Sequence, residues 1–224
     1  MGQLAKPSSA YYQPLDMLLG SPALVRVLRV LSLHGGFLSA TEVAERAGLN
    51  RVGSKRLLDQ LVETRLVERS GRARSVLYHL GDDTFLAPVI QALFRQESGR
   101  IDGVGHMVRE IAQRVQPAPL AVWHFGSVAR AEDTFASDYD LAIVGDASQL
   151  AQQKAQFWSL LSEAAEPWLI RPSLISLSED DVWANYREQT AFWQNMQRDG
   201  VVLFGKSPEQ VVYGRKKHEG RRSD

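Results

Sequence analysis

The chain contains the stretch Phe125-Gly126-Ser127-Val128-Ala129-Arg130, and Ser137-Asp138-Tyr139-Asp140-Leu141 follows it closely. Short apolar runs flank this stretch, at 120–125 before it and at 141–144 after it. Each run is rich in strand-forming residues and is bounded by polar or turn residues, which predicts two buried strands. The polar residues between them therefore belong to a connection that joins one strand to the next.

The polar residues of this connection have the spacing of a phosphate site. Gly126 and Ser127 fall where the first strand ends and a helix can begin, so backbone N–H groups there can face a phosphate. Asp138 and Asp140 lie two residues apart on the next strand, so both carboxylates point to the same face. Hard oxygen ligands of this kind suit Mg²⁺, which binds through a few carboxylates plus substrate phosphates. The stretch therefore predicts a site for phosphoryl or nucleotidyl transfer.

The same residues resemble the signature of the polymerase β nucleotidyltransferase superfamily, and most closely that of its minimal nucleotidyltransferases. That signature reads Gly-Ser-x-Ala-Arg-Gly, a spacer, then Ser-Asp-x-Asp-Leu, and the ending at 199–205 is also common in these proteins. The matching residues are Gly126, Ser127, Ala129, Arg130, Ser137, Asp138, Asp140 and Leu141.

The resemblance implies roles for these residues. Asp138 and Asp140 are expected to be the catalytic residues that hold Mg²⁺ or Mn²⁺. Gly126, Ser127 and Arg130 are expected to bind the phosphates of an NTP, whose NMP passes to a hydroxyl acceptor on a protein, an RNA or a small molecule. Small relatives often act in toxin–antitoxin pairs, which implies a protein partner as one acceptor.

Two positions depart from the family pattern. Ala131 stands where the family usually has Gly, which matters little if the backbone there is helical. The third carboxylate of active members is expected on the strand at 171–177, where Ser173, or less well Ser176, takes its place. The acids at 179–181 are interpreted as the first turn of the next helix, and their substitution for the missing ligand is the alternative. The second functional hypothesis is therefore a transcription regulator whose degenerate transferase domain only binds or senses a nucleotide.

The N-terminal region predicts three helices and a hairpin. Apolar spacing places helices at 21–34, 40–47 and 51–64, and strand-like runs at 66–69 and 75–80. Ser39 and Glu42 form a capping box before the second helix, and Asn50 can cap the third.

This order resembles a winged helix-turn-helix domain over residues 20–82, which implies double-stranded DNA as a partner. The expected DNA-binding residues are basic or polar positions on the third helix and on the wing: Arg51, Ser54, Lys55, Arg56, Arg72 and Arg74. Winged helices also mediate protein contacts, which is the alternative. A homodimer is expected, because helix-turn-helix proteins usually bind paired half-sites.

The fold class is therefore α+β: the winged helix-turn-helix plus a polymerase-β-like α/β domain with a small mixed sheet at 116–205. A helical connector is expected at 83–115, with a break near 98–105, and its apolar stripe is interpreted as core packing rather than as a dimerisation face. One helix is expected at 147–165. A second at 179–198 is aromatic-rich, and its aromatic side chains are interpreted as core rather than as base-stacking groups.

Composition and charge add limits to this organisation. The chain has no cysteine, which excludes a disulfide framework and a thiolate metal site. Polarity at the N-terminus and the lack of an apolar run of about 20 residues predict a soluble cytoplasmic protein with no membrane partner. The zero net charge divides into +4 over residues 1–82, −7 over 83–205 and +3 over 206–224. The acidic middle argues against broad nucleic-acid binding by the transferase domain, and the basic tail at 206–224 is predicted to be disordered.

Overall fold

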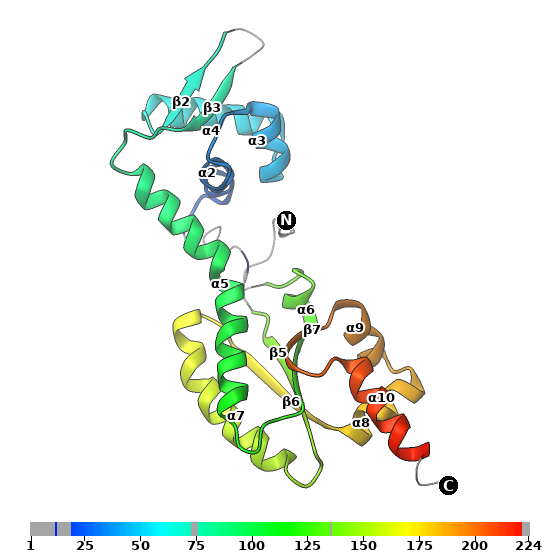
Figure 1. Ribbon diagram of the computed structural model, residues 1–224. Coiled ribbons are helices and arrows are strands. Elements are labelled where there is room, and N and C mark those ends of the chain that lie inside the picture. The colour runs from blue at the N-terminus through cyan, green and yellow to red at the C-terminus, as the bar shows by residue number, and fades with distance from the viewer. Residues whose placement is uncertain (1–11, 13–18, 73–75, 135, 221–224) are drawn as a thin grey trace. The chain divides into compact units, whose positions relative to one another are not determined.

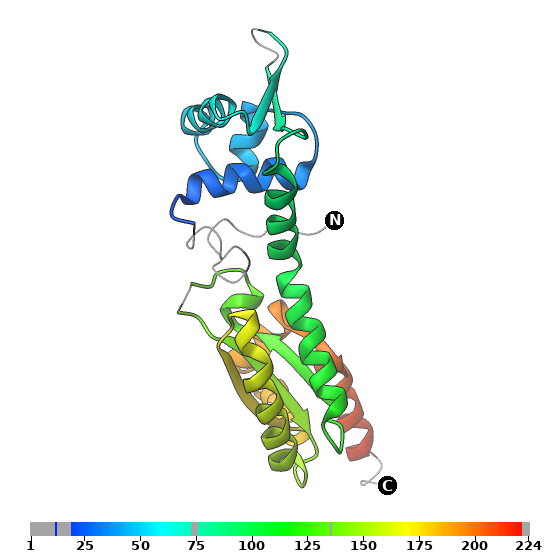
Figure 2. The same cartoon turned by 90° about the vertical axis from the view of Figure 1, so that its left-hand side faces the viewer.

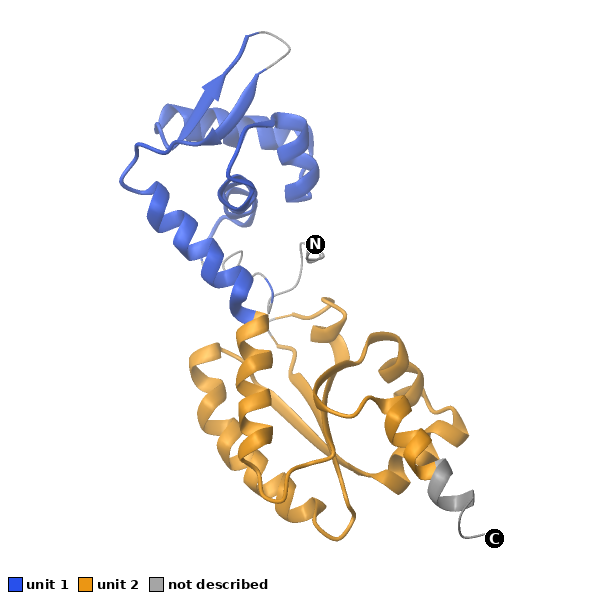
Figure 3. Ribbon diagram, viewed as in Figure 1, with its two compact units in different colours: residues 1–100 blue, residues 101–224 orange. Residues whose placement is uncertain are grey.

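The computed structural model describes residue 12 and residues 19–72, 76–134 and 136–220 (Figure 1). The chain divides into two compact units, residues 1–100 and 101–224 (Figure 3). The boundary falls inside one long helix, α5, which runs from Ala87 to Arg114. In the described part of the chain, no helix is both long enough and apolar enough to cross a membrane.

The first unit is a winged helix-turn-helix. Its helices are α2 (Pro22–His34), α3 (Ala40–Ala47) and α4 (Arg51–Glu63). Its strands are β1 (Leu38–Ser39), β2 (Val67–Ser70) and β3 (Leu77–Leu80), in the antiparallel order β1-β3-β2. The expected capping box is present, because Ser39 Oγ accepts from Glu42 N and Glu42 accepts from Ser39 N. The two-residue strand β1 was not predicted, since so short a run has no detectable alternation.

A buried ion pair connects α2 to the beginning of α5 in this unit. The guanidinium of Arg29 donates from Nε and Nη2 to both carboxylate oxygens of Glu97, at 2.6 and 3.0 Å. It also lies over the ring of Phe94, 5.3 Å from the centroid. Two buried opposite charges with bidentate geometry are strongly coupled, because breaking one partner leaves the other uncompensated.

One expectation for the connector is wrong, and another is only partly right. Helix α5 is continuous through the expected break at 98–105. Gly103 is required there by packing, because a Cβ on it would lie 2.2 Å from the ring of Trp168. The apolar stripe is core only in part. Phe94 is buried and Ile90 packs against the buried cluster of this unit. The stripe's other large side chains are exposed: Phe85, Leu86, Val89 and Leu93.

The second unit contains a four-stranded mixed sheet in the order β6-β5-β4-β7, as predicted for the fold class (Figure 1). The strands are β4 (Ala121–Phe125), β5 (Tyr139–Gly145), β6 (Pro172–Ser178) and β7 (Val201–Gly205). Only β5 and β6 are parallel; β4 is antiparallel to both β5 and β7. The short helix α6 (Gly126–Ala129) follows β4, and α7 (Leu150–Ala165) connects β5 to β6 through a 3-10 turn at Glu166–Trp168.

Helices cover both faces of this sheet. Figure 2 looks onto α7, with the strands behind it. The opposite face packs on α8 (Glu179–Glu188), α9 (Ala191–Asp199) and α10 (Pro208–Gly220). Residues from these helices and from the sheet form one buried cluster: Ala121, Trp123, Ala142, Val144, Val182, Trp193, Met196, Val211 and Val212.

The C-terminal helices differ from the sequence expectation in two ways. The helix expected at 179–198 is two helices, because Gln189 takes a left-handed conformation (φ 50°) and Thr190 caps α9 by accepting from Trp193 N. The tail is not disordered over 208–220 but forms α10, with Val211 and Val212 buried. Ser207 caps this helix by accepting from Gln210 N.

Candidate functional site

The sheet brings the two halves of the sequence stretch together. Strands β4 and β5 pair so that Phe125 lies opposite Asp140. Gly126 is the next residue after Phe125, so the beginning of α6 lies beside the second aspartate. Asp140 and Ala142 lie two apart on β5 and therefore point to the same face of the sheet. Ala142 and Trp123 pack against α9 on that face, so the site opens on the side of the sheet that α9 covers.

Gly126 and Asp140 approach so closely that only glycine fits. Gly126 has φ +82°, and a Cβ on it would lie 2.2 Å from Oδ2 of Asp140. The left-handed conformation alone already favours glycine. A backbone turn and a carboxylate that sequence reasoning placed on separate elements are therefore in direct contact.

The two aspartates differ in environment. Asp138 precedes β5 and its side chain is 57% exposed, with Oδ1 4.0 Å from Nε of Arg171. Asp140 is half-buried, and burial raises the pKa of its carboxyl above the ordinary value. The hydrogen bond from Ser173 and the charge of Arg130 act against this rise in the pKa of Asp140, whereas the carboxylate of Asp138 adds to it. The charged form of Asp140 is therefore costly in the free protein, and a cation beside it would relieve that cost.

Ser173 occupies the position expected for the third carboxylate. It lies opposite Asp140 in the parallel pairing of β5 with β6, and its hydroxyl donates to the Asp140 carboxylate. The alternative, replacement by an acid at 179–181, does not agree with the structure. Ser178, which precedes these acids, pairs with Gly145, five residues further along the strands, or roughly 16 Å. As the sequence indicated, the acids form the first turn of α8, where Asp181 completes a capping box.

The donor set available to a metal is a carboxylate pair with one hydroxyl. Across residues 12, 19–72, 76–134 and 136–220, no three His, Cys, Asp or Glu side chains gather in a way that could hold a metal ion. Mg²⁺ commonly uses only one or two protein carboxylates and completes its shell with water and phosphate oxygens. Asp138 and Asp140 therefore fit Mg²⁺ bound together with a triphosphate, and they do not form a complete protein cage.

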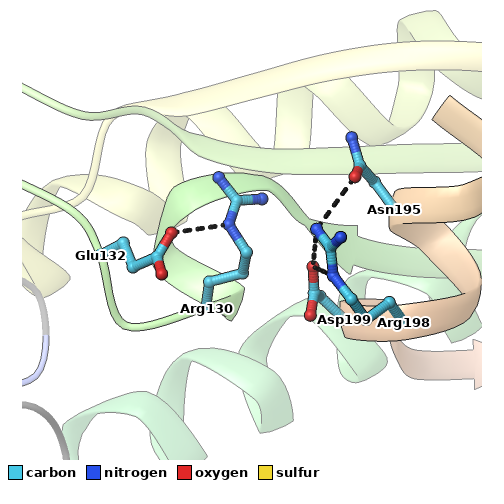
Figure 4. Close-up of polar contacts among 5 residues, drawn as sticks. All are labelled: Arg130, Glu132, Asn195, Arg198 and Asp199. Atoms are coloured by element: carbon cyan, nitrogen blue, oxygen red, sulfur yellow. Dashed lines mark hydrogen bonds and ion pairs between the residues drawn. The ribbon is translucent and has the colours of Figure 1, made fainter. Parts of the chain in front are cut away.

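Arg130 lies at the end of α6 and forms an ion pair with Glu132, with Nε 3.0 Å from Oε2 (Figure 4). Between these two residues, Ala131 has φ +53°. The condition under which alanine would matter little here, a helical backbone, is therefore not met. A glycine is the usual family residue here because a left-handed conformation costs roughly 1–2 kcal/mol for other residues.

The predicted DNA-binding face of α4 is only partly as expected. Arg51, Lys55 and Arg56 are exposed and line an open groove of about 810 Å³ along the helix, together with Val52, Asp59, Gln60 and Glu63. Ser54 is fully buried, which corrects its assignment as an exposed DNA contact. Ser54, Leu58 and Leu61 have the i, i+4, i+7 spacing of a buried stripe, so the sequence already carried this signal.

Two other basic residues predicted to bind DNA that the structure describes differ in their surroundings from Arg51 and Arg56. Lys55 is bound to Asp59 one turn later, with Nζ 2.6 Å from Oδ2. Arg72 is exposed just after β2, at the start of the wing, whereas Arg74 lies outside the described residues. The basic residues of the predicted DNA-binding set that the structure describes thus lie on α4 and at the base of the wing.

Two family models match the chain, one within each unit. Residues 107–209 match the family model described as polymerase beta, nucleotidyltransferase, and residues 24–71 match the IclR helix-turn-helix domain. Among solved structures, the MarR family transcriptional regulator SPO1453 from Silicibacter pomeroyi DSS-3 is similar at 26% identity, over 43% of this chain and 71% of that chain, with a TM-score of 0.35. No curated protein sequence matches the chain. The protein therefore joins a helix-turn-helix domain to a nucleotidyltransferase domain of the polymerase β family.

Proposed function

We propose that this protein binds double-stranded DNA through its winged helix and transfers NMP from an NTP to a hydroxyl acceptor at the site around Asp140. One observation carries the second half of this proposal. Gly126 and Asp140, from the two halves of the signature stretch, are packed so closely that a Cβ on Gly126 would lie 2.2 Å from Oδ2 of Asp140. A phosphate bound by the turn would therefore lie beside the carboxylate pair.

Each residue has a role that follows from its position. Gly126 and Ser127 present backbone N–H groups to the β- and γ-phosphates, and Arg130 offsets their charge. Asp138 and Asp140 hold the divalent cation. When bound, Mg²⁺ or Mn²⁺ supplies positive charge that stabilises the charge developing on the phosphates.

The transfer itself is an in-line displacement. The acceptor oxygen forms a bond to the α-phosphorus while the bond from that phosphorus to pyrophosphate breaks. The hydroxyl proton leaves to solvent, because Ser173 is a poor proton acceptor at neutral pH. The described residues do not identify the acceptor. A protein side chain, an RNA end and a small molecule are therefore the three classes of acceptor to test.

A label-transfer assay tests this proposal. The purified protein is incubated with each of four α-³²P-labelled NTPs and Mg²⁺, with and without cell lysate. The expected result is label on a protein, RNA or small-molecule product, and the double variant Asp138→Asn, Asp140→Asn transfers none. The proposal of nucleotidyl transfer is wrong if wild type and double variant give the same background with all four nucleotides.

A second candidate function is a transcription regulator that binds the NTP without transferring it. The hydroxyl of Ser173 in the position of the third carboxylate favours it, since this group cannot serve as an anionic metal ligand. Its test is DNA binding: an NTP with Mg²⁺ would change the affinity for a selected operator while no label is transferred. A homodimer on paired half-sites belongs to either function and is measured by the mass of the protein–DNA complex.

A further inference from the structure

A second guanidinium lies near the Arg130 end of the site. Arg198, on α9, donates from Nε and Nη2 to Oδ2 of Asp199, at 2.9 and 2.8 Å, and from Nη2 to Oδ1 of Asn195 at 3.0 Å. Figure 4 shows its head group and that of Arg130 in the same small region, one from each of two helices that pack together. Its side chain is 64% exposed, so a ligand can reach it.

The carboxylate of Glu132 is electrostatically coupled to both arginines. Its Oε2 accepts from Nε of Arg130 at 3.0 Å. The pKa of Arg198 is raised first by Asp199 and then by the more distant charge of Glu132. Arg130 in turn acts on Asp140, lowering the pKa of that carboxyl. The two guanidiniums, Glu132 and the aspartate pair therefore belong to one electrostatic system.

The negative charge around the site would repel a triphosphate unless a second positive side chain such as Arg198 offset it. Four acids, Asp138, Asp140, Glu132 and Asp199, face three arginines, which are Arg130, Arg198 and the Arg171 beside Asp138. Residues 83–205 carry a net charge of −7. A triphosphate adds several more negative charges to this region. Arginine is suited to the task because its planar head group forms bidentate charge-assisted hydrogen bonds with phosphate oxygens.

We infer that Arg130 and Arg198 together bind the polyphosphate chain of the nucleotide, and that Glu132 competes with the phosphates for these guanidiniums in the free protein. This inference rests on the proposed nucleotide site, and it adds a reason for that site to prefer some nucleotides over others. Because the contact is to the outer phosphates, Arg198 distinguishes nucleoside triphosphates from monophosphates. Asp199 and Asn195 hold the head group in place from the protein side.

Calorimetric titration with ATP and with AMP, each with Mg²⁺, tests the inference. Arg198→Ala is expected to weaken ATP binding about tenfold, the effect of one charge-assisted hydrogen bond, and to leave AMP binding unchanged. Arg198→Lys is expected to fall between wild type and Arg198→Ala. Glu132→Gln is expected to tighten ATP binding, since it removes the competing charge.

The matched control is Arg114→Ala, which removes an exposed positive charge at the far end of α5. Unchanged ATP binding in Arg198→Ala, or an equal loss for ATP and AMP, overturns the inference. The two levels of failure are distinguishable. If ATP binds and the Asp138→Asn, Asp140→Asn variant loses it while Arg198→Ala does not, only the role of Arg198 is wrong. If wild type binds no nucleotide, the proposed function and this inference are both overturned.

Discussion

The hydroxyl of Ser173 donates a hydrogen bond to the carboxylate of Asp140 across the parallel strands β6 and β5. The hydrogen bond favours the charged form of Asp140, against the effect of burial. The fold therefore places a neutral donor where the family pattern has an acid. This contact bears on both functions considered for the domain, because it favours the charged form of Asp140 but supplies no third negative ligand.

Ser173→Asp is expected to complete a three-carboxylate metal site. It should raise the rate of Mg²⁺-dependent label transfer by about tenfold or more, since one well-placed charge contact is worth about 1.4 kcal/mol or more. The control is Ser176→Asp, three residues further along β6 and on the opposite face of the strand. Equal rates for the two variants would show that the position of the new carboxylate is irrelevant.

Gly126→Ala is expected to lower the free energy of unfolding of the second unit by about 2 kcal/mol, because it forces both strain and a clash with Asp140. Urea unfolding followed by tryptophan fluorescence measures it, since all five tryptophans lie in residues 101–224. Gly214→Ala, in α10 with nothing within 4 Å of its added Cβ, is the matched control and should be neutral or slightly stabilising. A stability loss as large in Gly214→Ala as in Gly126→Ala would contradict the argument.

Stability at acid pH is expected to depend on His124. Burial lowers the pKa of this β4 side chain from 6.5 to about 4. The ring stacks on Tyr139 with ring centroids 4.0 Å apart. Within the described residues, its Nε2 has no hydrogen-bond partner. Below pH 6.5 the unfolded chain takes up a proton that the folded protein does not bind until about pH 4. The free energy of unfolding should therefore fall over this window, by up to about 3 kcal/mol.

His124→Phe keeps an aromatic ring on Tyr139 and removes the titration, so its unfolding free energy should depend less on pH between 6.5 and 4. His106→Gln, at an exposed position of α5, is the control and should behave as wild type. Parallel pH profiles for wild type and His124→Phe would exclude His124 as the cause.

DNA binding is expected to depend on the exposed cations of α4. The double variant Arg51→Ala, Arg56→Ala should weaken duplex binding and make the plot of log affinity against log salt less steep by about 2, one unit for each lost phosphate contact. Asp59→Asn should act in the opposite direction, since it releases Lys55 from its ion pair. Arg95→Ala, at an exposed position of α5, is the control and should leave the salt slope unchanged. If Arg95→Ala changed the slope and the double variant did not, the DNA would bind to a surface other than α4.

The sequence predicted the strands and caps well because their signals are local. The apolar runs at 120–125 and 141–144 contain β4 and most of the buried residues of β5, and Ser39 with Glu42 marked a helix start. The errors come from tertiary packing. Gly103 suggested a helix break, but it is small because Trp168 packs on it. The family resemblance, and not a local pattern, indicated Ser173 for the position of the third carboxylate, and the strand register places it opposite Asp140.

Calorimetric titration of the four NTPs with Mg²⁺ into wild type and into the Asp138→Asn, Asp140→Asn variant shows whether the two aspartates are needed for nucleotide binding. We expect one-site binding of at least one NTP to wild type. We expect loss of that binding in the variant, which retains the shape of both side chains but not their charge. Binding of equal strength to both proteins, or no binding of any of the four to wild type, would contradict this expectation.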